Sequence, residues 1–127
     1  MTTLLTNTRR PDISFHANGR IDITARTAKL LGLKPGDVID IAVDSNEYLL
    51  YVRHRAAVGR HEAQCYRTNR RSVVCNNLRA YSRRLCDIIL AMHHGAQDVR
   101  LPVGELQQHA ELGAVLPIII RNNLFKS

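Results

Sequence analysis

The sequence predicts a single α+β domain, and three observations lead to this fold class. Short segments in which apolar and polar residues alternate occupy positions 13–53, which is typical of half-buried β-strands. A helical spacing of apolar residues follows at 78–93, and strand-like segments lie at 99–103 and 114–120. Because the chain has only 127 residues, one hydrophobic core accounts for its whole length, and we expect one domain.

The chain begins with a polar segment, and a β-hairpin follows it. Residues 1–12 show no periodic apolar pattern, so we expect a loose tail there. Asn18-Gly19 is a strong hairpin signal, because both residue types accept the positive φ angles of a tight turn. We therefore expect paired strands at 13–15 and 20–24.

A short helix and a second pair of strands complete the first part of the chain. Thr24 can cap the helix, and Gly32 can end it in a left-handed conformation. Strands at 38–43 and 48–53 follow, on either side of a polar turn. From the alternation in the first of these strands we expect three side chains to face the core: Ile39, Ile41 and Val43.

The clearest helical pattern lies in the second half. Apolar residues recur at steps of three and four over 78–93 and predict an amphipathic helix that packs on the sheet, with Asn77 as its cap and Gly95 beyond its end. The apolar stripe of this helix consists of Leu78, Tyr81, Leu85, Ile88, Ile89 and Met92. By contrast, residues 54–77 show no periodicity, so we expect a basic loop. A segment this long without structure also indicates a functional loop or a missed element. Residues 78–120 then supply the helix and a C-terminal pair of strands.

The formal charge of +7 is concentrated in the middle of the chain. Residues 54–91 hold eight arginines and two acidic residues, whereas residues 1–53 hold seven basic and six acidic residues. Arginine presents a planar fork to phosphates, and a basic stretch is typical of nucleic-acid binding. The alternative is a solvated basic surface. In the first interpretation, six arginines would contact phosphates: Arg60, Arg67, Arg70, Arg71, Arg79 and Arg83.

Residues 18–43 also carry a family-like succession of motifs. Gly19-Arg20, an alternating strand, Leu31-Gly32-Leu33 and a Gly36-Asp37 turn follow one another in order. This succession resembles the AbrB/MazE swapped-hairpin family, over about residues 13–53. The resemblance implies that two such units interlace into a small barrel, that the protein is a homodimer, and that it binds DNA.

The resemblance also implies DNA-contacting roles for two residues, Arg20 and Lys29. The family usually has proline where this chain has Thr24, and a second basic residue where it has Ala28. Asp22 is expected on an outward face, where it would repel phosphates. The hairpin is therefore either a DNA-contacting unit or a dimerisation scaffold whose DNA contacts have moved into the arginine-rich middle.

A weak internal similarity links the two ends of the chain. Val99–Val103 is similar to Gly19–Ile23, and Leu112-Gly113 is similar to Leu31-Gly32. One interpretation is that residues 98–120 are a degenerate repeat of 19–43, and the other is chance. With a repeat, the chain itself would supply the second hairpin unit that the resemblance otherwise expects from a partner.

The three cysteines do not form a metal or catalytic signature. They cannot all pair within one chain, and no apolar leader precedes them, so we expect reduced thiols in the cytoplasm. His61, Cys65 and Cys75 lack the close cysteine pairs of a zinc site. A thiol nucleophile assisted by His61 is chemically possible, but inert cysteines are the favoured interpretation. We expect Cys86 to be buried, as a small apolar side chain.

No glycine-rich phosphate loop, serine nucleophile elbow or membrane-spanning apolar run is present in the sequence. We therefore predict no catalytic residue, metal, cofactor or small-molecule substrate. Tyr66 lies among the arginines and could stack on a nucleic-acid base, or it could pack against the core. The sequence thus favours a non-enzymatic DNA-binding regulator that acts as a homodimer. The alternative is an interaction or assembly protein that uses its sheet only to oligomerise.

Overall fold

The computed structural model describes residues 12–53, 63–68 and 77–120, and over these ranges the protein is α+β, with two helices and two antiparallel sheets. The first sheet consists, in spatial order, of β6 (Tyr66–Arg67), β7 (Leu78–Tyr81), β2 (Arg20–Ile23), β1 (Asp12–His16) and β8 (Asp98–Pro102). The second sheet consists of β5 (Ala63–Gln64), β3 (Val38–Asp44), β4 (Glu47–Val52), β10 (Gly113–Ile118) and β9 (Gln107–His109). The helices are α1 (Ala25–Leu31) and α2 (Arg83–Ala91).

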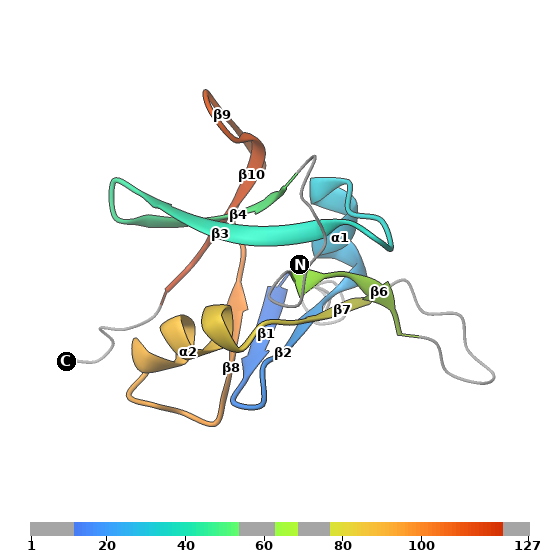
Figure 1. Cartoon of the computed structure of the whole chain (residues 1–127). Helices are drawn as coiled ribbons and strands as arrows, with labels where there is room; N and C mark the ends of the chain where they lie inside the picture. Colours follow the sequence, from blue (N-terminus) through green and yellow to red (C-terminus); the bar gives the residue numbers. More distant parts are fainter. Residues whose placement is uncertain (1–11, 54–62, 69–76, 121–127) are drawn as a thin grey trace, which may run out of the picture.

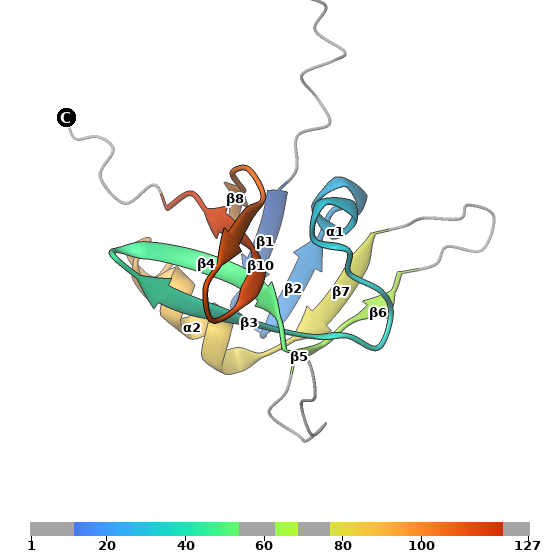
Figure 2. The same cartoon turned by 90° about the horizontal axis from the view of Figure 1, so that it is seen from above.

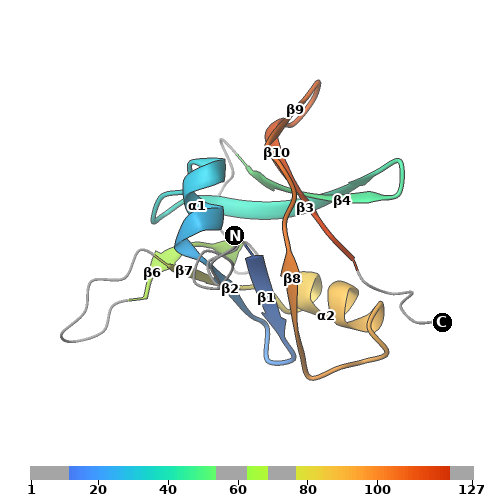
Figure 3. The same ribbon diagram turned by 180° about the vertical axis from the view of Figure 1, so that it is seen from behind.

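The two sheets enclose one hydrophobic core. Figure 1 shows β3 and β4 running across the molecule above β1, β2 and β8, while α1 and α2 lie on opposite sides. The view from above and the view from behind show the same separation of the two helices (Figures 2 and 3). Both sheets and both helices supply fully or nearly fully buried side chains, among them Ile13, Phe15, Ile21, Ile23, Ile39, Leu50, Leu116, Leu31, Leu85 and Ile89.

The expected hairpin and the short helix after it are confirmed. Gly19 occupies the hairpin turn with φ of 96°, a left-handed angle that glycine adopts without steric cost. The Thr24 hydroxyl accepts a hydrogen bond from the Thr27 N–H at the start of α1. Gly32 ends the helix in the left-handed region and donates its N–H back to the last turn.

The prediction of a helix over 78–93 is wrong at its beginning. Residues 78–81 form β7, and α2 starts only after Ser82, whose hydroxyl accepts a hydrogen bond from the Leu85 N–H at 3.2 Å. Asn77 does not cap this helix; its side-chain oxygen instead accepts from the Ala25 N–H of α1 at 2.7 Å. The apolar spacing misled the sequence analysis because a strand and the helix that follows it both face the same core. Gly95 lies beyond the helix end as expected, in the left-handed region.

Three further predictions need correction. The strands expected at 99–103 and 114–120 are present as β8 and β10, but they do not form a pair: they belong to different sheets, and a single bridge between Val103 and Ile118 links them. In the described part of the expected basic loop, residues 63–68 form the short strands β5 and β6, so this part is an element that the pattern did not reveal. Ile39 is buried and Ile41 is partly buried as expected, but Val43 is 61 % exposed. Val43 lies near the tip of the β3–β4 hairpin, which extends past the edge of the core (Figure 1).

The chain has an internal two-fold arrangement centred on the β2–β7 pair. Arg20 pairs with Tyr81 and Ile23 pairs with Leu78. A two-fold rotation about the middle of this pair therefore places each four-residue strand on the other. Each strand leads directly into a capping hydroxyl, Thr24 or Ser82, and then into a helix. Each helix is followed by a left-handed glycine.

The strands around this centre are exchanged between the two halves. The strand that follows α2, β8, pairs with β1, and the strand that follows α1, β3, pairs with β5. The first strand of each half therefore pairs with a strand of the other half. The suggested repeat partner of 19–23 was 99–103, but residues 99–102 lie in β8, after the helix, and the counterpart of β2 is β7.

Candidate nucleic-acid interface

Four cationic side chains gather in a groove between α1 and β6. The groove measures about 530 Å³, and Arg26, Lys29, Lys34 and Arg67 line it together with apolar residues such as Leu78. Lys29 and Arg67 are two of the residues that the sequence analysis predicted as phosphate contacts. Arg26 and Lys34 were missed, because charge was compared over residues 1–53 as a whole, where seven basic residues nearly balance six acidic ones.

The local structure explains why these side chains reach the groove. Helix α1 buries Thr27, Ala28 and Leu31, so Arg26 and Lys29, three residues apart, share its exposed face. Lys34 follows the glycine that ends the helix. Arg67 lies at the exposed edge of the first sheet, on the strand β6.

The charge of the groove is one-sided. Among the described residues, no carboxylate lines the groove and none of the four cations forms an ion pair. Four like charges around a shallow depression raise the local electrostatic potential and favour an anionic partner. The arrangement can therefore hold several phosphates of a polyanion.

Two other predicted residues, Arg20 and Arg79, meet on a different surface. Both lie on the outer face of the first sheet, where Asp22 contacts them. The Arg79 Nε donates to Asp22 at 2.7 Å, and the Arg20 Nε donates to the same carboxylate at 3.1 Å. His16 lies 3.0 Å from it through Nε2. These contacts hold the two arginines in place against the sheet.

The pKa of Asp22 is shifted by its burial and by these contacts with Arg79, Arg20 and His16. Partial burial pushes the pKa upward, but the hydrogen bond and charge of Arg79, the charge of Arg20 and the hydrogen bond of His16 outweigh burial. The net effect lowers the pKa below its ordinary value, so the carboxylate stays charged at neutral pH. Asp22 thus neutralises part of the positive charge here, in contrast with the groove at α1.

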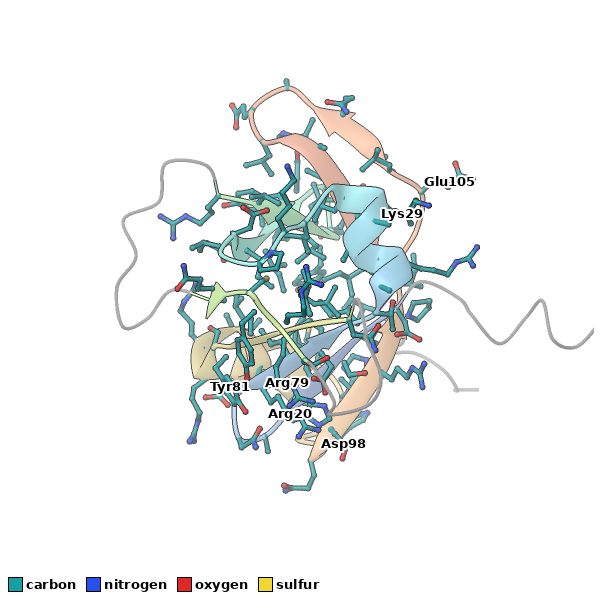
Figure 4. The ribbon with its side chains drawn as sticks, turned by 90° about the vertical axis from the view of Figure 1, so that its right-hand side faces the viewer. Arg20, Lys29, Arg79, Tyr81, Asp98 and Glu105 are labelled. Carbon is teal, nitrogen blue, oxygen red and sulfur yellow. The ribbon has the colours of Figure 1, made fainter. Side chains whose placement is uncertain are left out.

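The register of the strands places these side chains in one row across the first sheet. Tyr66 of β6 pairs with Arg79, Arg79 with Asp22, Asp22 with Ser14, and Ser14 with Arg100 of β8. Figure 4 shows Arg79, Arg20, Tyr81 and Asp98 together at this face, with Lys29 on the helix above them. Arg100 donates its Nε to Asp12 at 2.7 Å, so this arginine is also paired.

Of the remaining predicted contacts, only Arg83 falls within the described residues, and it lines neither surface. Arg83 is the first residue of α2, and its side chain packs close to Gly19, where an added Cβ would lie 3.2 Å from its Cδ. Helix α2 lies on the opposite side of the molecule from α1 (Figure 1). Arg60, Arg70 and Arg71 lie outside the described residues.

Tyr81 is a surface residue that the sequence analysis assigned to the wrong environment. As part of an expected helix it belonged to the apolar stripe, but β7 turns it outward, next to Tyr66. The two rings stack with centroids 6.3 Å apart and an angle of 9° between their planes. Tyr66 does not pack against the core, which was the alternative to a role in base stacking.

The cysteines within the described residues are buried. Cys86 is buried as expected, and so is Cys65. Burial raises the pKa of Cys65 to about 12, so its thiol is protonated at neutral pH and a poor nucleophile. No group of metal-ligating side chains is found in the part of the chain that the structure describes, from which His61 and Cys75 are missing.

Comparisons with known proteins found no match to this chain among protein-family models, curated sequences or solved structures. None of the helices in the described ranges is long and apolar enough to cross a membrane. The function must therefore be argued from the geometry of the chain itself.

Proposed function

We propose that this protein binds nucleic acid, with DNA as the expected partner, through the basic groove formed by Arg26, Lys29, Lys34 and Arg67. The observation that carries the proposal is that none of the described residues lining the groove bears a carboxylate, while Asp22 contacts the arginines on the neighbouring sheet face. Lysine and arginine contacts to phosphates supply most of the affinity of sequence-independent binding. They position the protein on the nucleic acid and do not select a sequence.

The size of the expected effect follows from counterion release. Each neutralised phosphate contributes about 0.9 to the slope of log affinity against log salt, so four contacts give a slope of about 3.6. At that slope, affinity falls roughly a hundredfold between about 50 and about 200 mM salt. Binding of this kind would be easily measured at low salt.

We also propose that the chain contains both units of a swapped-hairpin barrel. The exchange of strands between the halves, with β8 on β1 and β3 on β5, supports this view. A homodimer was expected because one hairpin unit leaves an apolar face uncovered. In this protein residues 63–68 and 77–120 cover that face, so we propose a single chain as the binding unit. The homodimer stays a prediction.

The test compares two double variants by fluorescence anisotropy with a labelled duplex over a series of salt concentrations. Lys29→Ala/Arg67→Ala removes two groove cations and should lower the salt slope by about 1.8. Arg83→Ala/Arg84→Ala removes the same charge from α2 and should leave the slope nearly unchanged. Circular dichroism of each variant verifies that the fold is intact.

Two results would contradict the proposal. An equal fall in slope for both variants would show that net charge acts without the groove. No binding of the unaltered protein to duplex or single-stranded DNA at low salt would exclude the function and favour an assembly protein.

A further inference from the structure

We infer that the stacked pair Tyr66 and Tyr81 is a platform for an unpaired base, and that the preferred partner is a single-stranded segment of nucleic acid. The inference rests on the proposed function and specifies the form of nucleic acid that is bound. A base inside a duplex has both faces covered by its neighbours, whereas an unpaired base can stack on an aromatic ring.

The two tyrosines are placed as a recognition surface requires. Tyr66 is 43 % exposed and Tyr81 is 48 % exposed, although both are large and partly apolar. They come from adjacent strands, β6 and β7, and stack on each other with nearly parallel planes. Strands hold their side chains more rigidly than loops do, so little conformational entropy is lost when a base stacks.

Charges beside the rings favour an anionic ligand with a flat face. Arg79 lies directly across from Tyr66 in the strand register, and Arg20 lies directly across from Tyr81. Asp22 engages the Nε of each arginine and balances only one of the two positive charges. On β7 and β2, next to the rings, one positive charge therefore remains and the guanidinium groups are fixed in orientation, whereas Asp98 and the Arg100–Asp12 pair lie farther along the sheet, on β8 and β1.

The platform and the basic groove are connected along the surface. Leu78 of β7 lines the groove, and it also lines a second depression of about 280 Å³ that contains Arg79 and Asp22. Asn77 and Thr24 border this second depression, at the N-terminus of α1. Leu78 is itself buried, but Arg67 lines the groove and the next residue, Thr68, lines the second depression. A strand whose phosphates occupy the groove can thus continue past Thr68 towards Arg79 and present a base to the tyrosines.

Other features of the described chain give weaker grounds for an inference about a partner. The surface hollow between the β3–β4 hairpin, α2 and β10 is lined by apolar residues such as Val43 and Ile119, but nothing in the described chain indicates what would cover it. Cys65 and Cys86 are buried away from solvent. The tyrosine platform is distinguished by charge complementarity next to its aromatic rings.

The experiment measures the affinity of the full-length protein for four labelled probes of equal length. They are oligo-dT, oligo-rU, a DNA duplex and an abasic DNA strand, which has the sugar-phosphate backbone but no bases. Replacing a stacking aromatic by alanine costs about 1–3 kcal/mol per base, which is roughly a 5- to 150-fold loss of affinity. Tyr66→Ala and Tyr81→Ala should show this loss on dT or rU and little change on the duplex or on the baseless strand. Tyr81→Phe keeps the ring and should retain the affinity. Ile88→Ala, which removes an exposed apolar side chain from α2, is the matched control.

A direct signal of stacking is available, because the chain has no tryptophan and its emission comes from four tyrosines. Oligo-dT or oligo-rU should quench part of this emission, and the quenching should fall in the double variant Tyr66→Ala/Tyr81→Ala. The strand that binds more tightly identifies whether DNA or RNA supplies the base.

The outcomes separate this inference from the proposed function. If the groove variant Lys29→Ala/Arg67→Ala weakens binding to every probe while the tyrosine variants weaken none, the groove binds nucleic acid and the platform is refuted. Equal losses on duplex and single strands for the tyrosine variants also refute it. If no probe binds, the proposed function fails as well.

Discussion

Asp22→Asn is expected to lower stability and to raise nucleic-acid affinity in the same protein. The carboxylate bridges two strands, since Arg20 lies on its own strand β2 and Arg79 on the neighbouring β7. Its side chain is 31 % exposed, and those of the arginines are 34 % and 33 % exposed. Partly exposed ion pairs each contribute about 0.2–1 kcal/mol. The two arginine pairs sum to about 0.4–2 kcal/mol, and because asparagine keeps one acceptor oxygen we expect a loss of about 1 kcal/mol at neutral pH.

The pH dependence of this loss follows from the lowered pKa of Asp22. A carboxyl group whose pKa is depressed in the folded state stabilises the protein fully above its unfolded pKa, which is 3.8 for Asp22. That contribution disappears as the pH falls from this value through the lower folded pKa. The difference in unfolding free energy between the unaltered protein and Asp22→Asn should therefore be constant above about pH 5 and shrink in more acidic solution.

Urea denaturation at a series of pH values measures this difference, and salt-dependent anisotropy measures the affinity. The added net charge should raise the salt slope by up to about 0.9 if Arg20 or Arg79 gains a phosphate. Asp98→Asn is the control, because Asp98 lies on the same sheet, is exposed, and forms no ion pair within the described residues. Equal effects of the two substitutions on stability would refute the bridging role. A difference that persists unchanged at the lowest pH would refute the electrostatic origin.

The structure makes two further predictions. Ser82→Ala should destabilise the protein by about 1 kcal/mol, because the Leu85 N–H loses its capping acceptor. If the helix instead began at residue 78, Asn77→Ala would have the larger effect on α2. Circular dichroism, which measures the helix content of each variant, decides between the two. The buried thiols Cys65 and Cys86 should react with a thiol reagent only on unfolding, because burial raises the pKa of both; rapid reaction of either in native protein, identified by mass spectrometry, would contradict their placement.

The candidate site was only partly visible in the sequence. Lys29 was predicted from a family resemblance and Arg67 from a basic segment, and the structure brings the two into one groove. The contact between Arg79 and Asp22 could not be predicted, because these residues are 57 positions apart and meet only through strand pairing. An arginine that faces a carboxylate and one that faces a groove look alike in a sequence.

The tyrosine platform exists because residues 78–81 form a strand, and the sequence pattern did not distinguish this strand from a helix. The steps of three and four around Leu78 and Tyr81 are compatible with a helix, yet the β2 edge offers hydrogen bonds that pull residues 78–81 into a strand. As a strand, the segment buries Leu78 and Ala80 and turns Tyr81 outward. The conformation of this segment is therefore set by pairing with β2, a strand that lies far away in the sequence.

The sequence by itself determined the local elements of the first half, where Asn18-Gly19, Thr24 and Gly32 act through the backbone of their immediate neighbours. It also determined the buried faces of β1 and β2, since alternation alone separates apolar from polar side chains. Tertiary structure alone decided which strands are exchanged between the halves and which charges are neutralised. These outcomes depend on contacts between distant residues, whose free energy exists only once the chain has closed the loops between them.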